Sequence, residues 1–367
     1  MARPTPSKTK PAKADPPGLD QAITGFLATI PLFAEITPEE SMDVIRLLRR
    51  VELAPGEVLF EQGSPPGAMW VLGEGCVVGV SASRQAGSAP VALSTLRTGE
   101  TLGEMALIDD SPRSATATVT SGGQAQRIEA ADFEALRARF HPAAYKMLRR
   151  LAAEMARRLR VICVRIAPET EAPRGAASKG SAPLEAGARV APEALEKLAQ
   201  LKGLPSTVRL ALAQKLKEQS FARDALLFRQ GDPGDSAFIL VEGELALRRH
   251  GHPMARLGSG SMFGLVSAVD GGPRAADCLA ATDARVLRLA REDFEWLFHS
   301  GNRFAYQIVD LVARQMVSRL RQLNATLLVQ CSALPQAAWA TTDASMARGA
   351  LALAEIDIDI DIELDDA

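Results

Sequence analysis

The chain has 367 residues, and at about 150 residues per domain this length predicts two domains plus tails. Its 47% of hydrophobic residues and 23% of charged residues are typical of globular proteins, which excludes wholesale disorder. The formal charge of −2 excludes a protein that binds nucleic acid through a general basic excess.

Cysteine and histidine patterns indicate neither a metal site nor a catalytic site. The four cysteines, Cys76, Cys163, Cys278 and Cys331, are far apart and form no CxxC motif or Cys/His cluster. The four histidines lack metal-ligand spacing, and no nucleophile motif is present. We therefore expect no enzyme activity, no catalytic residue, no metal and no cofactor. No signal peptide or 18-residue apolar stretch is found, so we expect a cytoplasmic protein without a membrane span.

Composition divides the chain into five predicted segments. They are a disordered basic tail (1–20), a first domain (21–166), a linker rich in Ala, Pro and Gly (167–193), a second domain (194–325) and an Ala-rich, then acidic, tail (326–367).

An internal repeat relates the two domains. Leu59–Ser64 reappears as Leu227–Asp232, at an offset of 168 residues. Further on, Gly103, Arg113 and Tyr145 match Gly264, Arg274 and Tyr306 at an offset of 161. We assign the difference to a hairpin loop at residues 81–90 that is shorter in the second copy. The chain is therefore a duplication.

Each copy changes its periodicity in the same order. In the first copy we predict a helix at Pro38–Arg50, six strands and then two helices. The strands are Val58–Glu61, Ala68–Leu72, Cys76–Ser81, Val91–Leu96, Ala115–Val119 and Ala125–Glu129, and the helices are Asp132–Arg139 and Ala144–Val164. Gly and Pro interrupt the strands at short intervals, which favours a small antiparallel barrel or jelly roll. The predicted fold class is mainly β with flanking helices.

The segment from Gly103 to Thr116 has the residues of a phosphate site. Glycine lets backbone approach a ligand closely, a helical turn at 105–108 offers free N–H groups, and Arg113 can bind phosphate oxygens with its two-pronged guanidinium. Glu104 would repel a phosphate unless it accepts hydrogen bonds from another group, such as a sugar hydroxyl. These features predict a nucleotide site. The alternative is that Glu104 and Arg113 form only an internal ion pair.

With this segment the sequence resembles the cyclic nucleotide-binding domain family, which includes the catabolite activator protein and the regulatory subunits of cAMP-dependent protein kinase. The resemblance covers residues 22–165 and 195–325. The family cassette reads Phe-Gly-Glu-Leu-Ala-Leu and then Pro-Arg-Ala/Ser-Ala, and here Leu102 and Met105 replace Phe and Leu. The resemblance implies two jelly-roll-like β-rolls in tandem, with cAMP or cGMP as the ligand.

The same resemblance assigns roles to the cassette residues. Glu104 would bind the ribose 2′-hydroxyl and Arg113 the cyclic phosphate. The remaining predicted ligand-binding residues are Gly103, Met105, Ala106, Ser114 and Ala115, of which Gly103, Ala106 and Ser114 would supply donors. We expect cAMP in preference to cGMP.

The second cassette departs from this pattern. Gly264, Arg274 and Ala275 keep their positions, but Leu265 replaces the ribose-binding Glu and Asp277 replaces Thr116. A missing acceptor and an added negative charge should weaken binding by a few kcal/mol. We expect a degenerate site, the alternative being a weak anion site on Arg274.

The remaining segments bear on partners. No DNA-reading helix follows either roll, so we expect no direct DNA binding. The kinase regulatory subunits of this family carry an inhibitor segment with two adjacent arginines ahead of their first domain. Residues 1–30 contain one arginine, Arg3, so the sequence does not support such a segment here. The apolar faces of the long helices suggest a homodimer. The arginines at 149–160 indicate either a solvated helix face or a surface that contacts a partner.

The last segment, Glu355–Ala367, alternates acidic and apolar residues and holds seven carboxylates, so the rest of the chain carries +5. This tail either docks on an unidentified protein partner by strand addition or is a solvated acidic tail. Two hypotheses follow: a cyclic nucleotide receptor whose first domain repositions its long helix and the second domain, and a scaffold whose rolls and tail dock on a partner.

The scaffold hypothesis predicts that deleting residues 355–367 abolishes recovery of protein partners in pull-downs, because the tail would hold the docking strand. Unchanged recovery from the truncated chain would contradict it.

Overall fold

A computed structural model describes residues 25, 29–83, 88–167, 183–198 and 201–332. The predicted tail at 1–20 and residues 333–367 of the last segment lie outside these ranges, as does part of the predicted linker. The acidic tail hypothesis is therefore not addressed by the structure.

The first copy folds into two antiparallel sheets with helices at both ends. One sheet has the order β1-β8-β3-β6 and the other β2-β7-β4-β5. Its elements are η1 (Pro31–Phe33), α2 (Pro38–Ile45), β1 (Leu48–Leu53), β2 (Val58–Phe60), β3 (Ala68–Leu72), β4 (Val77–Ala82), β5 (Val91–Leu96), β6 (Thr101–Leu102), η2 (Glu104–Leu107), β7 (Thr116–Ser121), β8 (Gly123–Glu129), α3 (Ala130–Ala138) and α4 (Pro142–Ile166).

The second copy repeats this plan. Its sheets have the orders β15-β12-β17-β10-β9 and β11-β16-β13-β14. Its elements are β9 (Glu185–Arg189), α5 (Pro192–Glu196), α6 (Ser206–Lys215), β10 (Lys217–Phe221), β11 (Leu226–Phe228), β12 (Ser236–Glu242), β13 (Leu245–Arg249), β14 (His252–Leu257), β15 (Met262–Phe263), α7 (Leu265–Asp270), β16 (Asp277–Ala280), β17 (Ala284–Ala290), α8 (Arg291–His299) and α9 (Arg303–Ser332). The prediction of a mainly β chain with flanking helices is confirmed.

Two segments differ from the sequence-based expectation. The first helix begins as predicted, where Thr37 and Glu40 form a capping box, but it ends at Ile45 instead of Arg50. Leu48–Arg50 extend instead because they pair with Gln126–Ile128 of β8, so long-range pairing overrides the helical pattern there. The second difference is the strand β9, which lies within the predicted linker and pairs with β10 of the second domain.

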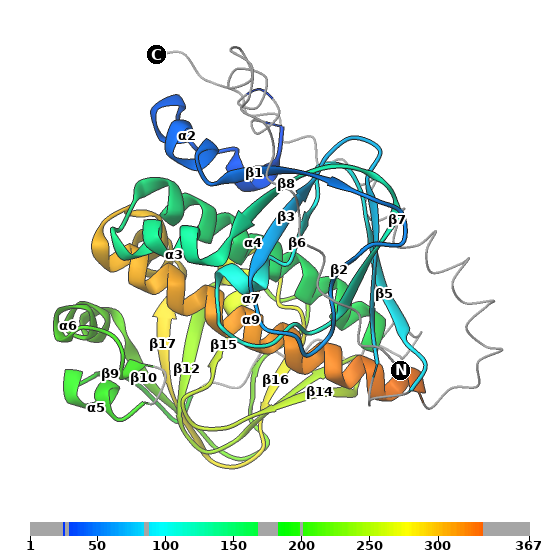
Figure 1. Ribbon diagram of the computed structural model, residues 1–367. Coiled ribbons are helices and arrows are strands. Elements are labelled where there is room, and N and C mark those ends of the chain that lie inside the picture. Colours follow the sequence, from blue (N-terminus) through cyan, green and yellow to red (C-terminus); the bar gives the residue numbers. More distant parts are fainter. Residues whose placement is uncertain (1–24, 26–28, 84–87, 168–182, 199–200, 333–367) are drawn as a thin grey trace, which may run out of the picture.

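The long helices α4 and α9 pack against each other between the two pairs of sheets, as Figure 1 shows. The ring centroids of the equivalent tyrosines Tyr145 and Tyr306 are 6.1 Å apart. The Tyr145 hydroxyl donates to the carbonyl oxygen of Phe298 at 2.5 Å. The helix faces predicted for a homodimer are thus in contact within one chain.

One apolar core continues through both domains. It includes Ile128 and Phe133 of the first domain, Leu151 of α4, and Phe294 and Val312 of the second domain. Each roll has a separate interior core, built around Trp70 in the first domain and around stacked phenylalanine rings in the second. The shared core therefore joins two rolls that are otherwise packed individually.

Among the described helices, none combines the length and the apolar character needed to cross a membrane. The described residues also bring together no group of three side chains suited to a metal ion.

The shared core predicts that the two domains unfold together. Leu151→Ala removes a side chain that is 1% exposed, and the resulting cavity should lower the free energy of unfolding by about 2–5 kcal/mol. Trp70 reports on the first domain and Trp296 on the second, so single-tryptophan variants in a Trp339→Phe background should show the same lowered denaturant midpoint. Val161→Ala, at an exposed position of α4, is the control. A lowered midpoint in one domain alone would contradict the shared core.

Candidate functional site

The first cassette begins where β6 leaves the sheet at Gly103. This residue has φ +79° and precedes the short helix η2. A Cβ atom here would lie 2.8 Å from Nη1 of Arg113 and 3.0 Å from the carbonyl oxygen of Ala68. Glycine is therefore required both for the left-handed backbone and for the close approach of the arginine.

Arg113 is buried beneath the cassette, with 7% of its surface exposed. Its Nη1 donates to the carbonyl oxygen of Gly103 at 3.1 Å and its Nη2 to that of Ala68 at 2.6 Å. The guanidinium lies 4.2 Å from the ring centroid of Phe60. Its Nε is buried and has no partner among the described residues. The arginine is thus held in place by neutral groups.

The charge of Arg113 is poorly compensated. Within the described part of the chain, no carboxylate lies within ion-pair distance of it. Burial lowers the pKa of Arg113 to about 10, and Glu104 offsets only part of that effect. A buried cation without a counterion favours the binding of an anion.

Glu104 is 2% exposed and does not pair with Arg113. Its Oε1 accepts a hydrogen bond from Nη1 of Arg158 at 2.6 Å. Its Oε2 is buried without a partner among the described residues. The alternative of an internal Glu104–Arg113 ion pair is therefore not what the structure contains, and one carboxylate oxygen remains available as an acceptor.

Arg158 of α4 was not among the predicted site residues. It also donates from Nε to Glu154 at 2.7 Å and from Nη2 to the carbonyl oxygen of Thr101 at 3.3 Å. Burial alone would lower the pKa of Arg158, but Glu104 and Glu154 outweigh burial and the pKa is raised. The sequence showed an arginine-rich helix but not which arginine faces the cassette.

The other predicted residues also lie in the cassette. The amide of Ala106 donates to the carbonyl oxygen of Gly103 at 3.0 Å, closing the turn of η2. Ser114 Oγ contacts Met105 Sδ at 4.0 Å. The amides of Ser114 and Ala115 have no protein acceptor in the part of the chain that the structure describes. These two N–H groups are free to bind an anion beside Arg113.

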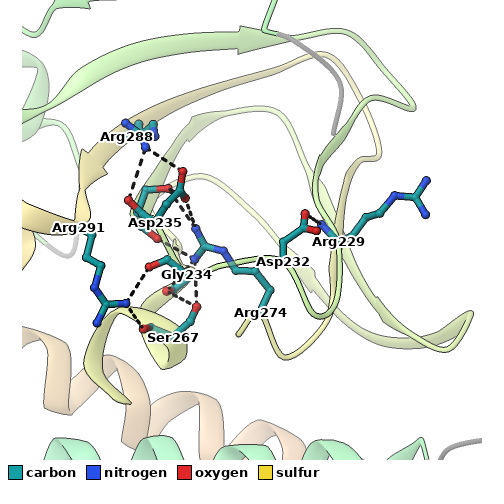
Figure 2. Close-up of polar contacts among 10 residues, drawn as sticks. Arg229, Asp232, Gly234, Asp235, Ser267, Arg274, Arg288 and Arg291 are labelled. Carbon is teal, nitrogen blue, oxygen red and sulfur yellow. Dashed lines mark hydrogen bonds and ion pairs between the residues drawn. The ribbon is translucent and has the colours of Figure 1, made fainter. Parts of the chain in front are cut away.

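The second cassette has a similar backbone conformation, but its arginine, Arg274, has different hydrogen-bond and ion-pair partners. Gly264 has φ +72°, and Nη1 of Arg274 donates to its carbonyl oxygen at 3.1 Å and to Oγ of Ser267 at 3.1 Å. Figure 2 shows that Asp235 joins this cluster. Its Oδ1 lies 3.0 Å from Nη2 of Arg274, and its Oδ2 lies 3.1 Å from Nη2 of Arg288. Arg274 thus has an internal carboxylate partner, which Arg113 lacks.

Asp235 is the second site residue that sequence reasoning missed. Its counterpart at the offset of 168 is Gly67, so the repeat itself marked the difference. Burial alone would raise the pKa of Asp235, but the hydrogen bond from Ser236 and the charges of Arg288 and Arg274 lower it. The carboxylate is therefore held as an anion.

The substitutions noted in the second cassette have different consequences. Leu265 is buried in the apolar core and offers no acceptor where Glu104 stands in the first domain. Asp277 accepts a hydrogen bond from the amide of Gln230 at 2.8 Å, just as Thr116 accepts one from the amide of Gln62 at 3.0 Å. The aspartate therefore fills the structural role of the threonine. The carbonyl oxygen of Ala275 accepts from Arg249 at 3.0 Å.

Replacing Gly103 by alanine should displace Arg113 as well as strain the backbone. We expect Gly103→Ala to lower the free energy of unfolding by about 1–3 kcal/mol more than Gly99→Ala. Gly99 has a similar φ of +85° but open space around its Cβ position, which makes it a matched control. Chemical denaturation measures both, and equal losses would show that the contact with Arg113 does not matter.

Comparison with known proteins finds the same family in both halves of the chain. Residues 50–140 and 218–300 match the family model of the cyclic nucleotide-binding domain. Over 315 residues the chain is 23% identical to a cAMP-dependent protein kinase regulatory subunit of Dictyostelium discoideum, covering 83% of this chain and 79% of that protein. It is 32% identical over 105 residues to a cyclic nucleotide-gated potassium channel of Rhizobium etli, covering 29% of each protein.

Among solved structures, the regulatory domain of Toxoplasma gondii PKA with cAMP is 20% identical, with a TM-score of 0.32. That match covers 78% of this chain and 95% of the other. The internal repeat, the two cassettes and the two matched stretches lead to the same conclusion. The chain contains two cyclic nucleotide-binding domains in tandem.

Proposed function

We propose that the first domain is a receptor for a cyclic nucleotide, cAMP in preference to cGMP. Binding there changes the packing of the long helices and so regulates a protein partner. In this proposal the protein acts in the cytoplasm by binding and catalyses no reaction.

The observation that carries this proposal is a pair of buried, unpartnered polar atoms in one cassette. Nε of Arg113 is a donor and Oε2 of Glu104 is an acceptor, and neither has a partner among the described residues. An anionic group would satisfy the first and a hydroxyl group the second. A cyclic nucleotide supplies both, as the cyclic phosphate and the ribose 2′-hydroxyl.

The second domain is proposed not to be a nucleotide receptor. Nε of Arg274 is also unpartnered, but Leu265 leaves no carboxylate for a ribose hydroxyl. The charge of Arg274 is balanced by Asp235. This supports a degenerate cassette over the alternative of a weak anion site.

Arg158 supplies a route from the ligand to the rest of the molecule. It joins Glu104 directly to α4, so a hydroxyl group bound to Glu104 acts on the same carboxylate as the helix. Helix α4 in turn packs on α9 of the second domain. Binding can shift the packing of these helices by the difference in ligand affinity between the two arrangements.

The choice of cAMP draws on a relative, since the name of the Dictyostelium subunit includes it. The partner protein is unidentified. A homodimer through the long helices would require α4 and α9 to exchange between chains, because their apolar faces pack against each other within this one.

Titration calorimetry of the full chain with cAMP and with cGMP tests the proposal. We expect Arg113→Ala to weaken binding at least tenfold, because a charge-assisted hydrogen bond contributes roughly 1.5–3 kcal/mol. Glu104→Gln should also weaken binding, because it removes the anionic acceptor.

Arg256→Ala is the control, since this side chain is 78% exposed on the second domain. The Arg256→Ala variant should bind both nucleotides with the same affinity as the parent. Absence of binding of both nucleotides to the parent, or parent-like affinity of Arg113→Ala, would refute the receptor function.

A further inference from the structure

Helix α9 of the second domain reaches the cassette of the first. Nη1 of Arg321 donates to the carbonyl oxygen of Pro112 at 2.7 Å, and its Nη2 lies 3.0 Å from Oδ1 of Asp109. Two turns further along α9, Leu328 lies in a small apolar cluster that also contains Ala82 and Ala115. The helix therefore contacts the cassette loop directly before Arg113.

The reciprocal contact exists at the second cassette. Arg160 of α4 pairs with Asp270 at the end of α7, with 2.8 Å between Nη2 and Oδ1. Arg160 and Arg321 are related by the offset of 161 residues, and so are Asp109 and Asp270. Each long helix thus holds the cassette of the opposite domain through the same pair of residues.

The two contacts differ in how the arginine is used. Arg160 also donates to Asp270 from Nε, so both carboxylate oxygens of Asp270 are engaged by one guanidinium. Arg321 contacts Asp109 through Nη2, while its Nε is buried without a partner among the described residues. One donor of Arg321 is therefore still available at the first cassette.

The two cassettes also differ in the charged partners of the equivalent arginines Arg113 and Arg274. Burial lowers the pKa of Arg113, Glu104 offsets part of this effect, and the positive charge of Arg321 lowers the pKa further. Asp109 pairs with Arg321 and Glu104 with Arg158, so neither neutralises Arg113. At the second cassette Asp235 pairs with Arg274 and Asp270 with Arg160. Among the described residues, Arg274 therefore has a carboxylate partner and Arg113 does not.

We propose that Arg321, supplied by the second domain, is a further positively charged residue of the anion site in the first domain. The site is then complete only when α9 is packed on the first cassette. This inference rests on the proposed function, because it assigns a role to Arg321 toward the ligand of that site. It also gives the second domain a task that requires no ligand of its own.

The test compares the affinity of the full chain for cAMP and cGMP in four single variants. Arg321→Gln removes the charge and leaves Asp109 unpaired beside the anion, so we expect about tenfold weaker binding. Arg321→Lys keeps the charge and should retain most of the affinity. Asp109→Asn removes a negative charge and frees Arg321, so binding should be as tight as in the parent or tighter.

The fourth variant, Arg160→Gln, breaks the equivalent contact at the second cassette and should leave the affinity unchanged. Thermal unfolding of each variant identifies any that fail to fold. The inference is overturned if Arg321→Gln binds within twofold of the parent, or if Asp109→Asn or Arg160→Gln weakens binding as much as Arg321→Gln. If the parent itself binds neither nucleotide, the receptor function fails and this inference fails with it.

Discussion

The packing of α4 against α9 is the contact on which the rest of the molecule depends. Each helix has an apolar face, and burying these faces in a shared core removes both from water. The result is one core that is shared by two rolls and contains the tyrosine pair Tyr145 and Tyr306. The duplicated sequence therefore folds as an internal pair of domains and not as two independent units.

This packing brings the ends of both helices to the cassettes. Arg158 of α4 reaches Glu104 in its own domain, while Arg321 of α9 reaches Asp109 across the interface. The first cassette is thus contacted by its own long helix and by the long helix of the other domain. Any ligand that alters this cassette acts on the domain interface, and by linkage the interface acts on the affinity for the ligand.

Buried charge explains why the two cassettes diverge although their backbones are alike. Burial of an arginine is costly unless an anion compensates it. In the second domain Asp235 supplies that anion from within the protein. In the first domain the corresponding residue is Gly67, and among the described residues Arg113 is held by carbonyl oxygens and by the rings of Phe60 and Trp70. Under the proposed function, a bound anion supplies the compensation there.

The sequence by itself determined the duplication, the mainly β fold class and the position of the cassette, because each depends on local patterns: a repeat offset, strand periodicity and a glycine-containing motif. It placed the strands Ala68–Leu72 and Val91–Leu96 at their observed bounds. It failed at Leu48–Arg50, where pairing with β8 decides the conformation. Only the tertiary structure showed that Arg158 and Arg321 contact the first cassette, since these contacts join residues 54 and 212 positions apart. Which arginine of a helix faces a distant loop depends on how the helix packs, and that packing is settled only when the whole core forms.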